Sequence, residues 1–222
     1  QTPSGITTSF ENRKAIYELA KKYQVLILED NPYGELRFVG ETVPTIKSLD
    51  TEGLGIYSGS FSKVLSPGIR VGFLSAPSAI ISKVVVAKQV NDVHTNILSQ
   101  ILCYRFLKEY DFDEHLSKLR TMYRHKCDLM LEQIEKEFAP CVSHTKPEGG
   151  LFLWCTLPEG ADMMDFCNRA VAEKVAVVPG IAFLARETDP CRSFRMNFST
   201  PTDEAIVEGC KRLGRLTHAL YD

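Results

Sequence analysis

Helical and strand-like segments alternate in the first third of the chain, and this alternation leaves few folds open. A helical segment begins at the capping pattern of Thr8 and Glu11. Residues 25–28 then form a continuous apolar run, which is typical of a strand buried on both faces. Two more short strands are expected at residues 56–58 and 71–74. We therefore predict an α/β fold with a mainly parallel sheet.

The rest of the chain predicts further helices and a second, smaller α/β unit. The expected elements are, in chain order, a helical segment over 78–107 with a break near 91–96, a helix over 113–138, a strand at 151–154, a helix over 162–173, strands at 176–178 and 194–198, and a last helix capped by Thr202. We place a domain boundary after residue 108, so that residues 1–108 belong to a large domain and residues 109–222 to a small one.

Chemically useful side chains follow two of the predicted strands. Asp30 comes directly after the first apolar run, and Ser60 and Lys63 follow the second predicted strand. Open α/β sheets bind their ligands at the carboxyl ends of their strands. The position of these side chains therefore agrees with their chemistry, and we expect a binding site at this edge of the sheet.

Lys63 is the centre of that expected site. A lysine that forms an imine works with an anion-binding loop, an arginine, a carboxylate and a phenol. The chain supplies these groups around Lys63 as Ser60, Arg70, Asp30 and Tyr33. Their order along the chain fits one cofactor, pyridoxal phosphate.

A series of motifs extends this pattern over the whole chain. In order they are Gln1-Thr2-Pro3-Ser4-Gly5, Glu29-Asp30-Asn31-Pro32-Tyr33, Ser60-Phe61-Ser62-Lys63, Pro67-Gly68-Ile69-Arg70-Val71-Gly72, Pro147-Glu148-Gly149-Gly150-Leu151-Phe152, Val178-Pro179-Gly180 and Phe194-Arg195-Met196-Asn197-Phe198-Ser199. Together they resemble the C-terminal part of a fold-type I pyridoxal-phosphate aminotransferase of class I/II. The chain is most similar to the 2-aminoadipate and kynurenine aminotransferases and to the aminotransferase-like domains of GntR-type regulators. Each motif alone is weak evidence for the family, whereas the whole set in this order is specific for it.

The resemblance implies a fold and a set of roles. It implies part of the mainly parallel sheet of a cofactor-binding large domain, followed by a smaller C-terminal α/β domain. Lys63 would hold the cofactor aldehyde as a Schiff base and later move a proton. Asp30 would keep the pyridine nitrogen protonated, and Tyr33 would hydrogen-bond the phenolic oxygen of the cofactor.

The resemblance also assigns two anion-binding sets. Ser60, Ser62 and Arg70 would bind the cofactor phosphate, because hydroxyls, turn N–H groups and a guanidinium together form a cradle for an anion. Arg195 would bind the α-carboxylate of the substrate through a two-pronged hydrogen bond, which lysine makes poorly.

The chain departs from the family pattern in two ways. The family usually has Asn at position 2, where the amide also contacts the phenolic oxygen of the cofactor, and this chain has Thr2. In the family, an N-terminal arm, a glycine-containing phosphate loop and an aromatic residue that stacks on the cofactor come before residue 1. We therefore expect a fragment or a processed chain from a protein that is a homodimer at full length. We expect the isolated chain to be inactive, to bind pyridoxal phosphate weakly or not at all, and to self-associate through exposed apolar surface.

Composition limits the kinds of partner and the location that we expect for this chain. The formal net charge of -2 and the pI of about 6.3 argue against direct nucleic-acid contact by this segment. No apolar run reaches the roughly 18 residues of a membrane span, and no signal peptide is visible. The seven cysteines form no C-x-x-C pair and the five histidines show no metal-ligand spacing. We expect a cytoplasmic protein with reduced thiols and no metal site.

The predicted reaction is the transfer of an amino group between an L-amino acid and a 2-oxo acid. Two alternatives stay open. One is a ligand-sensing domain of a GntR-type transcriptional regulator, whose DNA-binding module would lie upstream. The other is a pyridoxal-phosphate-dependent β-lyase, which would use the same lysine and aspartate. The fold does not choose among the three.

Overall fold

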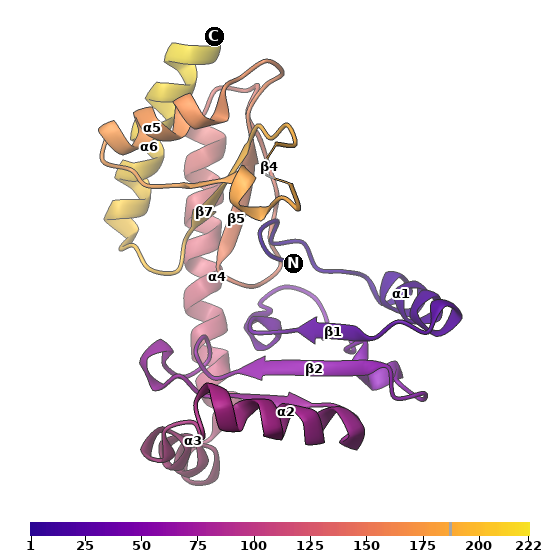
Figure 1. Ribbon diagram of the computed structural model, residues 1–222. Coiled ribbons are helices and arrows are strands. Elements are labelled where there is room, and N and C mark those ends of the chain that lie inside the picture. The colour runs from indigo at the N-terminus through magenta and orange to yellow at the C-terminus, as the bar shows by residue number, and fades with distance from the viewer. Residues whose placement is uncertain (187) are drawn as a thin grey trace. The chain divides into compact units, whose positions relative to one another are not determined.

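The computed structural model describes residues 1–186 and 188–222 (Figure 1). The chain divides into two compact units. We call Thr8–Leu119 the lysine unit, and we call Gln1–Thr7 together with Arg120–Asp222 the arginine unit. The domain boundary expected from the sequence stays a prediction, and each unit is described by itself.

The lysine unit is built around a three-stranded sheet in the order β1-β2-β3. Strands β1 and β2 are parallel, and β2 and β3 are antiparallel. The sequence predicted the alternation of helices and strands, and the α/β class is confirmed. The elements are α1 (Phe10–Tyr23), β1 (Ile27–Asp30), β2 (Gly55–Ser60), β3 (Gly72–Ser75), α2 (Ser78–Asn91), α3 (Ile97–Glu109) and the start of α4 (Phe112–Glu137), with short 3-10 turns at Gly34–Leu36, Lys47–Leu49 and Pro67–Ile69.

Helix α1 begins one residue later than its capping pattern predicted. The Ser9 side chain accepts a hydrogen bond from the Asn12 N–H at 3.2 Å, so Ser9 is the N-cap and Thr8 is not. Serine and threonine share the same capping chemistry, and a pattern that contains both leaves the start ambiguous by one residue.

The prediction of a first strand at residues 25–28, buried on both faces, is wrong in position and in burial. Strand β1 begins at Ile27, and Leu28 within it is 65% exposed. An apolar run is buried only where other elements cover it. Strand β1 lies at the edge of its sheet and pairs with β2 on one side, so its apolar residues meet fewer neighbours than the run implied.

The arginine unit contains a four-stranded sheet in the order β4-β5-β7-β6, and every pair in it is antiparallel. Its other elements, over the residues that the structure describes, are helices and a 3-10 turn. In chain order the unit holds the rest of α4, β4 (Ser143–His144), β5 (Phe152–Thr156), α5 (Met163–Ala172), β6 (Val178–Pro179), the 3-10 turn Gly180–Phe183, β7 (Ser193–Asn197) and α6 (Asp203–Tyr221).

Helices α5 and α6 lie beside each other next to β7 (Figure 1). The Phe166 ring of α5 packs against Phe194 of β7 with centroids 4.9 Å apart, and both residues are fully buried. The predicted cap of α6 is confirmed, because the Thr202 side chain accepts from the Ala205 N–H at 3.2 Å. This packing gives β7, which carries Arg195, a rigid support.

Candidate functional site

The carboxyl ends of β1 and β2 lie at one edge of the sheet in the lysine unit. Asp30, the last residue of β1, pairs with Ser58, and the Asn31 N–H donates to the Ser58 carbonyl oxygen at 2.9 Å. Strand β2 ends at Ser60, and Lys63 follows in the next turn. Because the two strands are parallel, Asp30 and the segment from Ser60 to Lys63 leave the sheet at the same edge.

A tight turn carries Lys63. The N–H groups of Leu65 and Ser66 both donate to the Phe61 carbonyl oxygen, at 2.9 and 3.2 Å. Val64 is buried, whereas Lys63 is half-buried. The turn therefore holds the backbone around Lys63 while the lysine side chain keeps partial access to solvent.

Ser60, Ser62 and Arg70 come together beside this turn. The Ser60 hydroxyl oxygen accepts from the Ser62 N–H at 3.1 Å, and Arg70 Nη1 donates to the Ser62 hydroxyl oxygen at 3.1 Å. Arg70 also donates to the Pro67 carbonyl oxygen at 3.2 Å. A guanidinium beside serine hydroxyls and turn N–H groups is a donor set that suits a phosphate. The residues present therefore fit the phosphate end of the predicted cofactor.

The residue before Asp30 anchors the end of β1. The Glu29 carboxylate accepts the N–H groups of Ile46 and Lys47, each at 2.9 Å, and lies 3.9 Å from an Arg13 nitrogen. These contacts hold the backbone of β1 against the segment that follows it. Asp30 itself presents an exposed side chain at the sheet edge.

Tyr33 lies just after β1, and its carbonyl oxygen accepts from the Leu36 N–H at 2.9 Å. Beside it, the Asn31 Nδ2 group donates to the Tyr57 hydroxyl at 3.1 Å. Burial raises the pKa of Tyr57, although the hydrogen bond from Asn31 opposes that shift. The sequence analysis did not predict the hydrogen bond between Asn31 and Tyr57. The one sequence signal for it was the position of Asn31 directly after Asp30.

In the arginine unit, two aromatic rings hold Arg195. Its guanidinium carbon lies 3.9 Å from the Phe152 ring centroid and 4.7 Å from that of Phe183. The Phe183 ring in turn meets Trp154 edge to face, with centroids 5.8 Å apart. Cation–π contacts of this kind fix a planar guanidinium in one orientation. The sequence analysis did not single out Phe183, which follows the Val178-Pro179-Gly180 motif.

Thr2 also belongs to the arginine unit. Its segment packs against β5 through Gly5, which has φ +71°, and a Cβ there would lie 2.7 Å from the Phe152 carbonyl oxygen. Glycine is required at this close approach. The predicted site residues thus form two sets, one in each unit. The lysine unit holds Asp30, Tyr33, Ser60, Ser62, Lys63 and Arg70, and the arginine unit holds Thr2 and Arg195.

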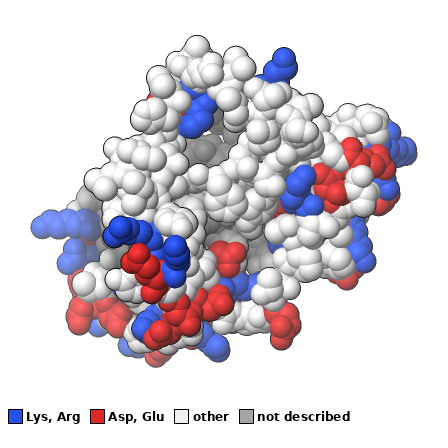
Figure 2. All heavy atoms as spheres, turned by 90° about the horizontal axis from the view of Figure 1, so that it is seen from below, with Lys and Arg blue, Asp and Glu red and all other residues white. Residues whose placement is uncertain are grey.

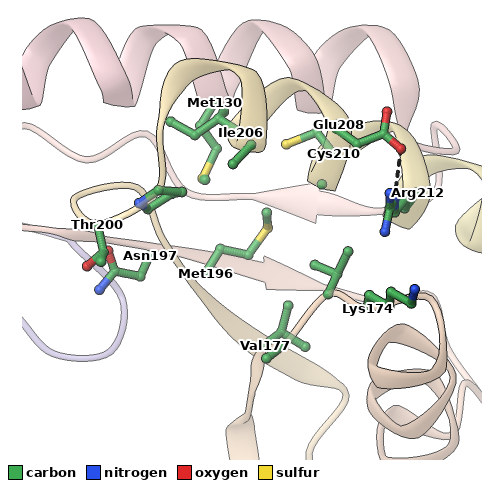
Figure 3. Close-up of a pocket in the computed structure, with 15 residues that line it drawn as sticks. Met130, Lys174, Val177, Met196, Asn197, Thr200, Ile206, Glu208, Cys210 and Arg212 are labelled. Carbon is green, nitrogen blue, oxygen red and sulfur yellow. Dashed lines mark hydrogen bonds and ion pairs between the residues drawn. The ribbon is translucent and has the colours of Figure 1, made fainter.

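A cavity of about 510 Å³ opens elsewhere in the arginine unit, between α4, α6 and the segment that leads into β6 (Figure 3). Met196 and Ile206 belong to its apolar lining, and an ion pair of 2.8 Å between Arg212 and Glu208 lies at its border. None of the predicted site residues lines this cavity. Cavity size therefore does not locate the predicted chemistry in this chain.

Charges of both signs occur together on the surface. On the face drawn in Figure 2, acidic and basic side chains lie side by side in several clusters, with uncharged residues between them. Among the described residues, the helices are too short or too polar for any of them to cross a lipid bilayer.

Comparison with known proteins gives consistent matches. Residues 1–213 match the family model described as "Aminotransferase class I and II". Aromatic-amino-acid aminotransferase 1 of Thermococcus litoralis is 45% identical over 213 residues, which cover 96% of this chain and 51% of the relative. The crystal structure of Pyrococcus horikoshii kynurenine aminotransferase, solved with PMP, has a TM-score of 0.96 and 40% identity, and the match covers 100% of this chain and 55% of that one.

A regulator also matches. The HTH-type transcriptional regulator YisV of Bacillus subtilis is 30% identical over 209 residues, which cover 94% of this chain and 43% of the regulator. The chain spans about half the length of the curated relatives it matches. The resemblance inferred from the ordered motifs is confirmed, since the family model covers nearly the whole chain. The chain belongs to the aminotransferase class I and II family.

Proposed function

We propose that the full-length protein is a pyridoxal-phosphate-dependent aminotransferase that moves an amino group between an L-amino acid and a 2-oxo acid. One observation carries this proposal. Asp30 ends β1 and pairs with Ser58 of the parallel strand β2, and Lys63 and the hydrogen-bonded Ser62 and Arg70 follow the carboxyl end of β2, in a chain of the aminotransferase class I and II family.

The lysine unit supplies the groups that bind and orient the cofactor. When bound, pyridoxal phosphate supplies an electron sink for the charge that develops at the substrate Cα. We assign Ser60, Ser62 and Arg70 to the phosphate, where charge-assisted hydrogen bonds are strong. Asp30 would pair with the protonated pyridine nitrogen, and Tyr33 would donate to the phenolic oxygen.

Lys63 has two tasks in this assignment. Its amine would hold the cofactor covalently, and the same amine would move a proton at the substrate Cα. Both tasks need a side chain that is held at its base and free at its tip. The half-buried position of Lys63 after a hydrogen-bonded turn is consistent with that need.

The arginine unit supplies the substrate contact. Arg195 binds the α-carboxylate through the N–H groups along the edge of its guanidinium, while Phe152 and Phe183 contact its faces. We assign Thr2 a contact with the cofactor, in which its hydroxyl takes the place of the Asn amide that the family usually has there.

A second candidate function is a ligand-sensing domain of a transcriptional regulator. The match to the Bacillus subtilis regulator favours it, because that regulator shares this segment with the enzymes. In this function the same site binds pyridoxal phosphate or an amino acid, and an attached module contacts DNA. We also propose a homodimer and a cytoplasmic location for the full-length protein, the latter because all seven cysteines are free thiols.

The test of the proposed function is an amino-donor screen on the full-length protein, run beside a Lys63→Ala variant. We expect wild-type protein to convert at least one pair of amino acid and 2-oxo acid, and Lys63→Ala to lose activity by at least about 100-fold. Lys118→Ala is the matched control, since Lys118 is an exposed lysine of the same unit, paired with Glu114 at 2.7 Å. Full activity in Lys63→Ala would contradict the proposal.

The isolated chain gives a separate test. We expect borohydride treatment after addition of pyridoxal phosphate to leave little or no adduct on Lys63 in the 222-residue chain. Peptide mass mapping reads the result directly. A stoichiometric adduct on Lys63 would show that this chain alone holds a complete attachment site.

A further inference from the structure

His115, near the start of α4, reaches the turn that carries Lys63. Its Nε2 lies 2.7 Å from the Val64 carbonyl oxygen, although the two residues are 51 positions apart in the chain. A carbonyl oxygen only accepts hydrogen bonds, so Nε2 carries a proton and donates it. Val64 directly follows Lys63. The hydrogen bond therefore acts on the backbone beside the proposed point of cofactor attachment.

This hydrogen bond ties the turn to a distant element. The other hydrogen bonds that the structure describes for residues 61–66 join partners within positions 60–71. Those local bonds shape the turn, whereas the bond from His115 fixes the turn against α4. Val64 is a buried residue and its hydrogen bond with His115 is part-buried, so its carbonyl oxygen has limited access to water when the donor is lost.

The donor itself is held in place. The His115 ring meets the edge of Phe106 with centroids 5.1 Å apart and lies stacked on Phe112 at 6.5 Å. The Asp111 side chain accepts from the Glu114 N–H at 2.9 Å and caps the first turn of α4. The imidazole is therefore oriented by packing before it meets the Val64 carbonyl oxygen.

We infer that His115 is a positioning residue for Lys63. It holds the turn 61–66 through the Val64 carbonyl oxygen, and so limits the directions from which the Lys63 amine approaches a carbonyl compound. The inference deepens the proposed function and rests on it, because it gives Lys63 the role of attachment point. The hydrogen bond between His115 and Val64 is an observation that stands apart from that role.

Two substitutions separate the hydrogen bond from the packing. His115→Phe keeps a planar ring against Phe106 and Phe112 but has no donor, whereas His115→Gln keeps an N–H donor at the end of a side chain of similar reach. The matched control is His125→Phe. His125 lies on the same helix, is exposed, and pairs with Asp203 in the arginine unit.

The first measurement is amide hydrogen exchange on the 222-residue chain without cofactor. We expect the Leu65 and Ser66 amides to exchange roughly five- to tenfold faster in His115→Phe, since one part-buried hydrogen bond is lost. Exchange should return towards the wild-type rate in His115→Gln and stay unchanged in His125→Phe. Equal exchange in His115→Phe and wild type would overturn the positioning role, and so would failure of His115→Gln to restore protection.

The second measurement uses the full-length protein with pyridoxal phosphate. We expect His115→Phe to lower the yield of borohydride-trapped adduct on Lys63 and to shift the pH at which the visible band of the bound cofactor titrates. His115→Gln should restore both. A substitution that only reduced the amount of folded protein would leave that pH unchanged. An unchanged pH and yield in His115→Phe would overturn the inference.

The two proposals fail differently. If wild-type full-length protein forms no adduct on Lys63, the proposed function is wrong, and the exchange experiment still tests whether His115 holds the turn. If wild type forms the adduct and His115→Phe behaves like wild type in both measurements, the proposed function stands, but His115 is not a positioning residue for Lys63.

Discussion

At the residue scale, the Asp50 carboxylate shows how one side chain sets the start of β2, the strand that leads to Lys63. Its two oxygens accept from the Leu54 and Gly55 N–H groups, each at 3.0 Å, and from Lys47 Nζ at 2.8 Å. The Asp50 side chain is only 2% exposed. Burial opposes ionisation, but the hydrogen bonds from Lys47, Gly55 and Leu54 outweigh it and hold the pKa of Asp50 well below its usual range.

We therefore expect Asp50→Asn to lower the free energy of unfolding by about 1.5–3 kcal/mol at neutral pH, because it removes charge-assisted hydrogen bonds to buried donors. A carboxyl whose pKa is lowered by folding stabilises the protein above its unfolded pKa of about 3.9, and this stabilisation fades as the pH falls below that value. The difference between variant and wild type should shrink in the same pH range. Urea unfolding near neutral pH and at about pH 3 measures both effects.

Asp92→Asn is the control for this prediction. Asp92 caps the C-terminal end of α2 and pairs with Lys88 at 2.6 Å, with both side chains more than two fifths exposed. Exposed pairs four residues apart on a helix contribute only about 0.3–0.5 kcal/mol. If the two substitutions lower the free energy of unfolding equally, the buried hydrogen bonds of Asp50 do not stabilise the protein more than an exposed ion pair does.

At the element scale, α6 contains two glycines in opposite surroundings. A Cβ at Gly209 would meet nothing closer than Val175 Cγ1 at 4.0 Å. A Cβ at Gly214 would come closer to the Glu137 carbonyl oxygen than atoms can pack, because α6 lies directly against the end of α4 there. The backbone oxygen of Glu137 cannot rotate away as a flexible side chain would.

We expect Gly209→Ala to raise the free energy of unfolding by up to about 1 kcal/mol, the helix propensity difference between the residues. Gly214→Ala should lower it by about 1–3 kcal/mol despite the same propensity gain, because the added methyl group forces the helices apart. Thermal unfolding of both variants, followed by circular dichroism, provides the comparison. Equal shifts of Tm in one direction would mean that α6 and α4 do not pack as closely as described.

At the scale of the whole molecule, the chain exposes much apolar surface on α2 and α3. No residue of α2 is buried, and Val90 and Leu98 are 86% and 64% exposed. Exposed apolar side chains gathered on two helices promote association between molecules.

We expect the 222-residue chain to self-associate in a concentration-dependent way, and the double variant Val90→Lys and Leu98→Lys to shift it towards the monomer. Sedimentation velocity over a concentration series measures the change. Val171→Lys on α5 is the control. Val171 is likewise exposed, at 60%, but it lies in the arginine unit, whereas Val90 and Leu98 lie in the lysine unit. A wild-type chain that stays monomeric at every concentration would refute this prediction.

Local sequence patterns predicted much of the secondary structure. The break between α2 and α3, the long helix α4, and the cap of α6 by Thr202 all follow from signals within a few residues of each other. The order of Asp30, Ser60 and Lys63 along the chain was enough to place them at the same sheet edge, because parallel strands joined by a crossover end on the same side.

Local patterns failed where the answer depends on distant neighbours. The apolar run at 25–28 suggested a buried strand, but burial is decided by what covers it, and Leu28 is exposed. The hydrogen bond between Asn31 and Tyr57 depends on how β1 pairs with β2. The two rings on Arg195 come from segments that meet only when the sheet of the arginine unit forms.

The amino-acid sequence by itself determined the family and the α/β class and predicted Lys63 as the candidate lysine, because these depend on residue types in a fixed order. Only the tertiary structure decided what supports that lysine, since the imidazole of His115 reaches the Val64 carbonyl oxygen from 51 positions away. The order and spacing of residues along the chain are given directly by the amino-acid sequence. A contact between residues far apart in the sequence forms only when the chain folds. Its two residues produce no periodic pattern from which the contact could be predicted.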